Sequence, residues 1–362
     1  MHGIGERAQE LLERVRPTAL HREIAAGIGM TPDAFSRALG GKRAFSSIEL
    51  ACLADLLDAD IHWLITGEPD PHRVVIAARH DYDHATGRRE VPGREADDQT
   101  LRDVVLAYRQ TNPVAWPADD LPATAGGVRA ALGDGFVRPF ADRLEGRLRV
   151  DVVRVAELST AYSFTFAGQR VIAVPATGNW FRENWSLAHE LGHLALGHHD
   201  GGLPAAEDDQ HEAAANAFAA ELLLPRGELA AVDWDGVDAP RLAGLIWGWG
   251  VSTDALARRL AALELPVAEL VHGWAGQPTQ RLLRRHRAAD AGLDEITDRM
   301  DAAARRRFPR GLQEEHLKRI AGGDLGKETL AWMLGIPPDA LDVDTPAIPD
   351  VSADELARAL GL

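Results

Sequence analysis

One short segment constrains this chain more than any other. Residues 186–198 read SLAHELGHLALGH, with His189 and His193 four positions apart. On an α-helix, side chains four positions apart lie on the same face, one turn above the other. A helix over this segment would therefore direct two imidazoles to one point, and this arrangement is typical of a site for a divalent metal ion.

Glu190 follows the first histidine and would lie beside such an ion. A divalent cation lowers the pKa of a bound water towards neutrality. A neighbouring carboxylate can then accept the proton that this water loses, so the motif predicts Glu190 as the catalytic general base of a hydrolysis. The alternative is a chance match, in which the helix and its histidines only help to build the core.

A catalytic zinc site needs a third protein ligand and leaves a fourth position open. Residues 211–225, HEAAANAFAAELLLP, offer Glu212, which follows His193 by 19 positions. This gap allows one loop and a second helix that turns back to the first. Asn216 lies one turn beyond Glu212 and is expected to hold a ligand histidine by a hydrogen bond. We expect one zinc ion per chain, although manganese or iron suits the same ligands.

Three further histidines lie near these motifs and are not expected to be ligands. His198 and His199 follow the expected end of the helix, and we expect them to be exposed or to support the ligands. His211 is adjacent to Glu212, so on a helix it faces away from it.

Around these motifs the sequence predicts an α+β fold that is mainly α. Residues 150–155 read as a strand, and residues 162–166 and 171–174 as a hairpin that precedes the catalytic helix. Helical apolar spacing predicts helices over residues 185–196 and 207–224.

We expect the hairpin to hold a substrate. A protease binds its peptide in an extended form, and an exposed strand edge offers backbone hydrogen bonds without demanding a sequence. The alternating residues 162–166 should pack an apolar face on the catalytic helix and leave an edge free. In the alternative, both edges are paired or covered and the sheet is purely structural.

The domain organisation is predicted from breaks in these patterns. Residues 81–100, DYDHATGRREVPGREADDQT, are polar and rich in turn formers, so we read them as a linker or an exposed loop. The expected regions are a helical module over 1–70, a linker and helical connector over 71–124, a catalytic domain over 125–275 and a helical C-terminal region over 276–362.

Parts of the chain resemble the ImmA/IrrE family of metallopeptidases. The matching strings are AHELGHLALGH at 188–198, EAAANAFAAELLLP at 212–225 and, more weakly, VSTDALARRLAAL at 251–263. The resemblance spans roughly residues 125–265 and implies a thermolysin-like (zincin) core.

The resemblance also assigns roles to single residues. It implies that His189, His193 and Glu212 are the metal ligands and that Glu190 is the base. Members of this family often carry a second acidic residue just before the Ala-Asn pair, whereas this chain has Ala214 there. Known members cleave transcriptional repressors and so switch on stress or mobile-element genes, which implies a repressor as the protein substrate.

Residues 20–67 resemble a helix-turn-helix of the XRE (Cro/repressor) type. Ala25 would allow two helices to approach, Gly29 would lie in the turn, and the helix from Thr31 to Leu39 would be the recognition helix. On this reading DNA binds through residues 1–70. The expected DNA-contacting residues are Thr31, Ser36, Arg37, Lys42 and Arg43.

Charge complicates DNA binding by this module. The chain carries a formal charge of −16, and residues 1–68 hold 7 Lys/Arg against 10 Asp/Glu. Specific DNA-binding domains usually show a basic surface. A module kept for docking or dimerisation is therefore the alternative. Residues 281–320 are net basic, with 11 Lys/Arg and 7 Asp/Glu, and form either a solvated helix face or a surface for an acidic partner or DNA.

The sequence as a whole predicts an intracellular zinc-dependent endopeptidase fused to a DNA-binding module that acts in transcriptional regulation. Cys52 is the single cysteine, which fits the reducing cytoplasm, and we expect neither a signal peptide nor a membrane span. A homodimer is possible. The alternative is a transcription factor or antitoxin-like regulator whose metal domain senses or docks without cleaving.

Overall fold

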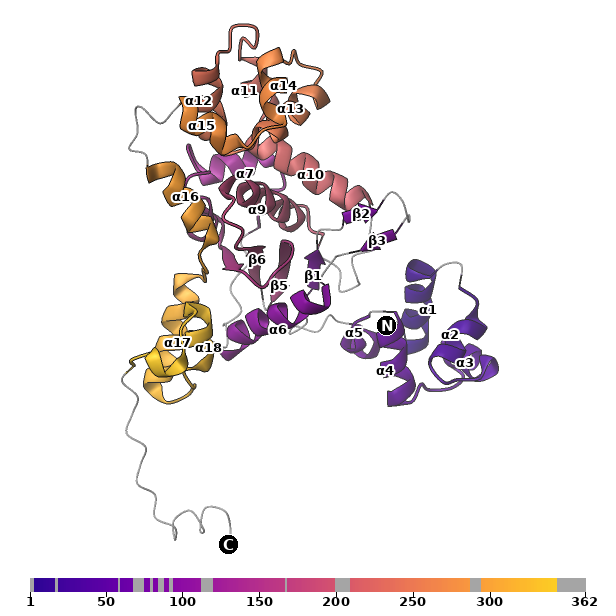
Figure 1. The fold of residues 1–362 in the computed structure, drawn as a ribbon. Helices are drawn as coiled ribbons and strands as arrows, with labels where there is room; N and C mark the ends of the chain where they lie inside the picture. Colours follow the sequence, from indigo (N-terminus) through magenta and orange to yellow (C-terminus); the bar gives the residue numbers. More distant parts are fainter. Residues whose placement is uncertain are drawn as a thin grey trace, which may run out of the picture.

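The computed structural model describes residues 3–16, 19–57, 59–67, 75–78, 81–83, 88–90, 94–111, 120–166, 168–198, 209–286 and 294–343. Figure 1 shows a group of short helices at the N-terminal end and a larger body in which helices cover both faces of a small sheet. The α+β, mainly α fold class that the sequence predicts is confirmed. None of the described helices is both long and apolar enough to cross a membrane.

Five short helices form the N-terminal module. The side chain of Thr31 caps the third helix by accepting a hydrogen bond from the backbone N–H of Ala34 at 3.3 Å. Gly29, with φ of 73°, forms the turn before this helix in a conformation that residues with a Cβ rarely adopt. The apolar sides of the five helices meet in one core around Phe35 and Leu53. The helices are α1 (Ile4–Val15), α2 (His21–Gly27), α3 (Pro32–Leu39), α4 (Ser47–Leu56) and α5 (Ile61–Thr66).

The main sheet has four strands in the order β1-β5-β6-β4. β5 runs antiparallel to both β1 and β6, whereas β4 runs parallel to β6. The hairpin of β5 and β6 is therefore paired on both sides, and the expected free edge for a substrate is absent from it. The strands are β1 (Val75–Ala78), β4 (Val150–Val155), β5 (Tyr162–Phe166) and β6 (Gln169–Pro175).

Helices cover this sheet on both faces, as Figure 1 shows. Val150 and Val152 of β4 belong to the core on the α9 side, whereas Val153 and Val155 belong to the core on the other side. A strand that is buried on both faces reads as a nearly continuous apolar run, which explains the pattern VDVVRV. The covering helices are α9 (Trp180–Ala195) and α10 (Asp209–Leu223) on one side and α6 (Arg94–Gln110), α17 (Arg310–Gly322) and α18 (Glu328–Leu334) on the other.

The hairpin faces the opposite way to the sequence-based expectation. Tyr162, Phe164 and Phe166 pack in the core with α6, α17 and α18. Because successive side chains of a strand alternate between faces, Ser163 and Thr165 point towards α9. The prediction that the apolar face packs on the catalytic helix is therefore wrong, because a second helical layer covers the sheet from below.

The described parts of residues 81–100 form strands and a helix rather than a linker. β2 (Asp81–Asp83) and β3 (Arg88–Glu90) form a separate antiparallel hairpin, and α6 begins at Arg94. The carboxylate of Asp97 accepts hydrogen bonds from the backbone and side chain of Ser159 and from the hydroxyl of Tyr162. These long-range bonds hold the polar first turns of α6 on the sheet, and no local pattern reveals them.

The remaining helices surround the core on the α9 side or lead into the C-terminal region. Residues 125–148 form short helical pieces that are interrupted around Gly133 and Gly135, both of which have positive φ. The elements are α7 (Ala125–Leu132), α8 (Phe140–Arg143), a π-helix (Leu144–Leu148), α11 (Arg226–Ala230), α12 (Ala239–Trp249), α13 (Thr253–Ala262), α14 (Glu269–Ala275), α15 (Thr279–His286), α16 (Asp294–Ala304) and a 3-10 turn (Pro338–Ala340).

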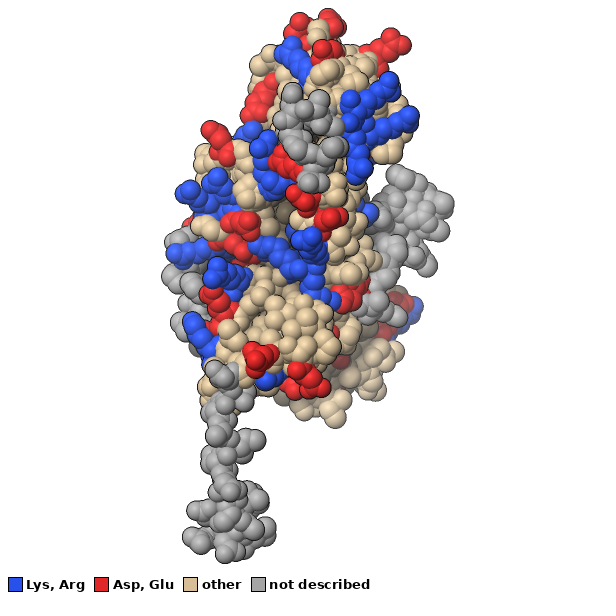
Figure 2. Space-filling model, turned by 60° about the vertical axis from the view of Figure 1, so that its left-hand side comes forward, with Lys and Arg blue, Asp and Glu red and all other residues tan. Residues whose placement is uncertain are grey.

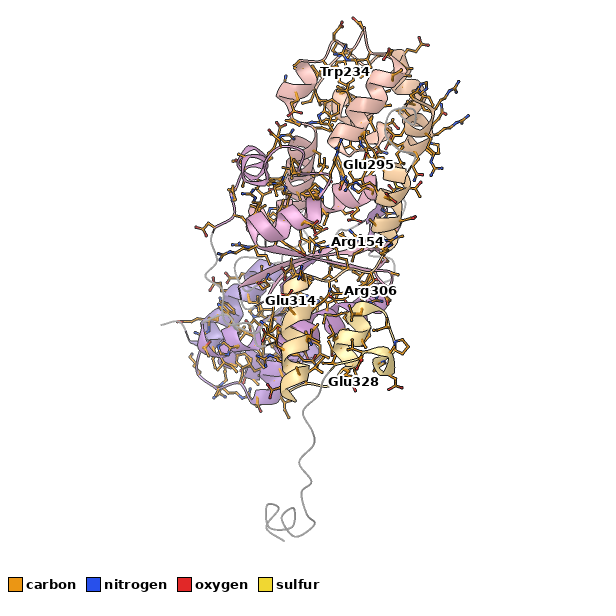
Figure 3. All side chains as sticks on the ribbon, turned by 90° about the vertical axis from the view of Figure 1, so that its left-hand side faces the viewer. Arg154, Trp234, Glu295, Arg306, Glu314 and Glu328 are labelled. Atoms are coloured by element: carbon orange, nitrogen blue, oxygen red, sulfur yellow. The ribbon has the colours of Figure 1, made fainter. Side chains whose placement is uncertain are left out.

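The basic run at residues 305–307 joins the C-terminal helices to the sheet. The guanidinium of Arg307 binds Glu145 and Asp142, and its backbone pairs with Arg154 on the outer side of β4. Buried Arg154, which is labelled in Figure 3, pairs in turn with buried Glu183 of α9. Arg306 pairs with Glu157, so two of the three arginines of the run are neutralised within the protein. Basic and acidic side chains are interleaved over the face drawn in Figure 2.

Asp151 on β4 gives the fold a pH dependence. Burial raises the pKa of this carboxyl to about 6, although the hydroxyl of Tyr108 donates a hydrogen bond to it at 2.8 Å. In the folded state the pKa of Asp151 lies above the usual value of 3.8, so the protonated carboxyl stabilises the fold fully below pH 3.8. This contribution to the free energy of unfolding is lost as the pH rises through about 6.

We therefore expect Asp151→Asn to gain stability relative to the parent protein as the pH rises from about 4 to about 7, by about 2–3 kcal/mol. The amide keeps an oxygen that can accept from Tyr108. Denaturant unfolding of both proteins at the two pH values measures the change. A stability difference that stays constant across this range contradicts the expectation.

Candidate metal centre

α9 carries His189, Glu190 and His193 in its second half. The helix starts at the cap of Asn179, whose side chain accepts from the N–H of Arg182. It buries His189 and Glu190 completely, and leaves His193 only 3% exposed. Buried polar groups of this kind need partners, so the surroundings of each one define the site.

A close approach of two helices brings Glu212 to the two histidines. A Cβ on Gly192 would lie only 3.2 Å from the backbone of Ala215 on α10. The absence of a side chain at Gly192 therefore lets α10 pack directly on α9. Glu212 lies one turn before Ala215, and this packing aims its carboxylate at the histidine face of α9.

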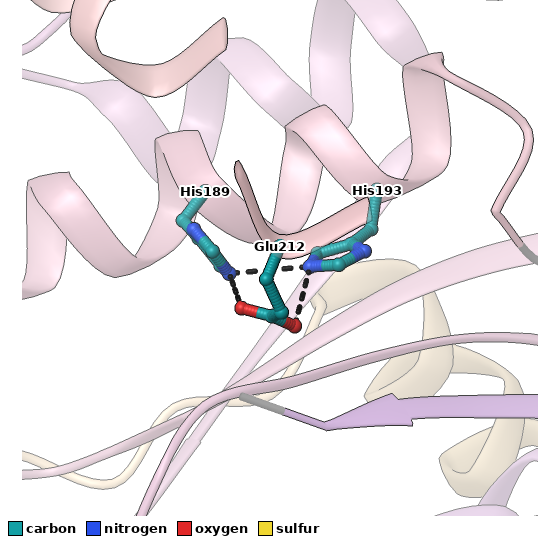
Figure 4. A group of neighbouring side chains, drawn as sticks. All are labelled: His189, His193 and Glu212. Carbon is teal, nitrogen blue, oxygen red and sulfur yellow. Dashed lines mark hydrogen bonds and ion pairs between the residues drawn. The ribbon is translucent and has the colours of Figure 1, made fainter. Parts of the chain in front are cut away.

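The three side chains converge on one point (Figure 4). Glu212 Oε2 lies 3.3 Å from His189 Nε2, and Glu212 Oε1 lies 3.3 Å from His193 Nε2. The two Nε2 atoms are 3.2 Å apart. Two ligand atoms on a tetrahedral zinc ion with bonds of about 2.0–2.1 Å are about 3.3 Å from each other. The two imidazoles therefore have the spacing of zinc ligands, and each oxygen of Glu212 lies at that distance from one of them.

The charges at this point also favour a cation. Burial alone would raise the pKa of Glu212, but hydrogen bonds with His189 and His193 hold it well below its usual range. Burial would lower the pKa of His193, but its hydrogen bond with Glu212 and the nearby Glu190 raise it. An ionised carboxylate is thus stabilised here by positive charge, which a divalent ion would also supply.

Glu190 lies beside this cluster, and among the described residues only one of its two carboxylate oxygens has a hydrogen-bond partner. The hydroxyl of Ser163 on β5 donates a hydrogen bond to Glu190 Oε2 at 2.7 Å. The other oxygen, Oε1, is buried and has no hydrogen-bond partner among the described residues. A buried carboxylate oxygen without a donor is costly, so this atom is suited to accept a proton from a water or substrate that enters the site.

The comparison with known families agrees with this geometry. Residues 147–261 match the family model of the M78 peptidases, described as the IrrE N-terminal-like domain. This segment is therefore similar to the IrrE N-terminal-like domain. The match supports the predicted ImmA/IrrE type for about a third of the chain, and it indicates a metallopeptidase-like domain. No curated protein and no solved structure matches the chain.

Within the matched segment, Asn216 lies beside His189. Its Oδ1 is 3.2 Å from Nδ1 of His189, within hydrogen-bond distance. If His189 offers Nε2 to an ion, its Nδ1 carries a hydrogen that Asn216 can accept. The amide then selects the tautomer and the orientation of the ring.

His198 makes the corresponding contact with the other histidine. Gly197 ends α9 with φ of 71°, and the backbone N–H of His198 then returns to the carbonyl of His193 at 3.1 Å. This helix end, a Schellman motif, folds the chain back over His193. Nδ1 of His198 consequently lies 2.9 Å from Nδ1 of His193. The ring of His211 stacks on that of His198, with centroids 4.1 Å apart.

One residue of this site was not singled out for its role by the sequence. Ser163 was noted only as a position on the hairpin, and no spacing rule connects a strand residue to Glu190. His198 was expected to be exposed or to support the ligands, and its contact with His193 agrees with the second of these. His199 lies outside the described residues.

The expected DNA-contacting residues lie on or close to α3, and Thr31 and Arg43 form hydrogen bonds within the protein. Ser36, Arg37 and Lys42 are exposed, whereas the hydroxyl of Thr31 caps the helix. Arg43 forms two hydrogen bonds with Glu49, at 3.0 and 2.8 Å, and this contact lowers the pKa of Glu49 to about 2. Arg43 must leave Glu49 before it can contact a phosphate.

Proposed function

We propose that this protein is an intracellular zinc-dependent endopeptidase. The observation that carries the proposal is the convergence of His189, His193 and Glu212 at tetrahedral ligand spacing, with Glu190 beside them. The match of residues 147–261 to a metallopeptidase family supports the same reaction class. Zinc suits two imidazoles and a carboxylate best, and manganese or iron could take its place.

Each residue of the site would have its own role in peptide hydrolysis. His189 and His193 would bind the ion through Nε2 and Glu212 through a carboxylate oxygen. The bound ion supplies Lewis acidity, which polarises the scissile carbonyl and acidifies water. Glu190 takes the proton from the attacking water and passes it to the leaving amine. Ser163 fixes the carboxylate of Glu190 in position through its 2.7 Å hydrogen bond.

We propose a transcriptional repressor or another regulatory protein as the substrate, with a thermolysin-like course of reaction. The support is the resemblance to a family whose members cleave repressors, together with an N-terminal module of repressor-like helices. The test is incubation of the zinc-loaded protein with a repressor encoded beside it. Cleavage by the unaltered protein and not by Glu190→Gln supports the assignment, and an intact repressor in both reactions contradicts it.

A regulator that docks or senses without cleaving is the second candidate. The observation in its favour is that β5, the strand next to Glu190, is paired on both sides. In this case the bound metal would stabilise the fold, and metal binding would be the signal to which the regulator responds. The same incubation separates the two, because only the peptidase yields repressor fragments.

We also propose that residues 1–70 bind DNA as a helix-turn-helix of the XRE type. The support is the capped α3 with Ser36, Arg37 and Lys42 on its exposed side or just beyond its end. A chain without residues 1–70 is expected to lose operator binding, and the affinity of the full chain should fall as salt is added. Gel-shift titrations at two salt concentrations measure both effects. If the truncated chain binds operator DNA equally well, the basic stretch at 281–320 is the better candidate.

His198 should matter for metal affinity although it is not a ligand. Its removal deprives the Nδ1–H of His193 of its acceptor, so that the ring is no longer held in the binding tautomer. We expect His198→Ala to weaken zinc binding by about 10–100-fold. Competition with a fluorescent zinc chelator measures this change. The matched control is His272→Ala, which alters an exposed histidine on α14 and should leave the affinity unchanged.

A further inference from the structure

The strand nearest to the proposed catalytic base is β5. Ser163 in its middle is fully buried and hydrogen-bonded to Glu190. One side of β5 pairs with β6. Its other side is the position from which an extended peptide could reach both the backbone of β5 and the metal cluster.

That position is filled by another part of the same chain. β1 runs antiparallel along β5, with Val75 opposite Thr165, Ile76 opposite Phe164, Ala77 opposite Ser163 and Ala78 opposite Tyr162. Ala77 is thus directly across from the residue that contacts Glu190. In Figure 1, β1 lies beside β5 and below α9.

β1 comes from a different part of the sequence than the other strands of the sheet. β4, β5 and β6 all lie within residues 147–261, which match the peptidase family model, whereas β1 lies outside that segment. β1 begins soon after α5, the last helix of the N-terminal module, which is capped at Gly67. Only residues 68–74 separate the module from the strand.

From these observations we propose that the outer edge of β5 is a binding site for an extended peptide segment and that β1 occupies it as an internal competitor. The proposal rests on the proposed peptidase function and deepens it. A substrate must displace β1 to form the same antiparallel pairing, in which backbone groups supply the affinity.

This arrangement makes the apparent affinity for substrate depend on the fraction of molecules in which β1 has left β5. A ligand that binds only the open form has its affinity reduced by that fraction. Locking β1 in place should therefore abolish binding, and removing it should strengthen binding. Neither change touches the metal ligands or Glu190.

A disulfide can lock the strand. Residues directly opposite each other in an antiparallel pair have Cα atoms about 4.5–5.5 Å apart, within the range that a disulfide spans. We would introduce Val75→Cys and Thr165→Cys together with Cys52→Ser, which removes the single native cysteine. Glu190→Gln is added to the same chain so that binding can be read without cleavage. The probe is fluorescein-labelled casein, an unfolded protein, and its anisotropy is measured with the zinc-loaded chain.

The reduced form is expected to bind the probe, and the oxidised form is expected to bind it at least about tenfold more weakly. A chain with Thr165→Cys and without Val75→Cys serves as the matched control and should not respond to oxidant. In a separate variant, residues 75–78 are replaced by Gly-Ser-Gly-Ser, and we expect tighter binding than in the parent. Equal affinities of the reduced and oxidised forms, or weaker binding after the replacement, would overturn the proposal.

Cleavage assays separate this proposal from the proposed function. In chains that retain Glu190, the Gly-Ser-Gly-Ser replacement should cleave casein faster than the parent. If neither chain cleaves but the lock still controls probe binding, the peptide site stands and the peptidase assignment falls. If both chains cleave at the same rate and the lock has no effect on binding, the assignment stands and β1 is a structural strand.

Discussion

Glu190→Gln is expected to abolish peptide cleavage while leaving the metal and the fold in place. The substitution removes the group that accepts the proton of the attacking water, and general-base catalysis contributes about 10²–10⁴-fold to a rate. Glu190 is not among the groups whose atoms converge on the metal point, so zinc binding does not depend on it. The amide oxygen of glutamine can still accept the hydrogen bond of Ser163, which preserves the local packing.

Three measurements on one preparation test this prediction. Zinc content should stay at one ion per chain, and the melting temperature should not fall, because a buried charge with one unpartnered oxygen is replaced by a neutral group. The cleavage rate should fall by about 10²–10⁴-fold. A Glu190→Gln protein that cuts the same substrate at the rate of the parent excludes Glu190 as the base.

Removal of one ligand is expected to have the second large effect. His193→Ala leaves Glu212 and His189 as the only remaining members of the described cluster, which is fewer than the three protein ligands of a catalytic zinc site. We expect stoichiometric zinc binding to be lost at micromolar zinc, and cleavage with it. His189→Ala should behave in the same way.

Glu212→Ala is the more informative member of this set, because Glu212 lies on a different helix from the histidines. Its carboxylate lies 3.3 Å from both Nε2 atoms, and no other carboxylate of the described residues joins that cluster. We expect Glu212→Ala to lose stoichiometric zinc and activity. Glu269→Ala, which alters an exposed glutamate at the start of α14, is the matched control. Full zinc occupancy and activity in Glu212→Ala would show that the third ligand lies elsewhere.

The chemistry of the site could be predicted from the sequence because it depends on local periodicity. His189, Glu190 and His193 share one helix, and the spacing of four residues determines which side chains share a face. Glu212 and Asn216 share the next helix by the same rule. The distances between these groups agree with the arrangement that the spacing predicts.

The sheet could not be predicted to the same extent. The strands β4, β5 and β6 were visible as short apolar or alternating runs, but their order and neighbours depend on pairing between distant residues. The sequence therefore suggested a hairpin with a free edge that packed its apolar face on α9. In the structure β1 covers that edge, and Tyr162, Phe164 and Phe166 face the opposite helical layer.

By itself the sequence determined that His189, Glu190 and His193 share one helix and that Glu212 and Asn216 share the next, because helical spacing is a property of neighbouring residues. Only the tertiary structure decided what surrounds them. The contact between Gly192 and Ala215 brings two helices together, and the bond from Ser163 to Glu190 joins a strand to a helix. Each of these contacts links residues far apart in the chain, and their formation depends on how the layers pack rather than on any local pattern.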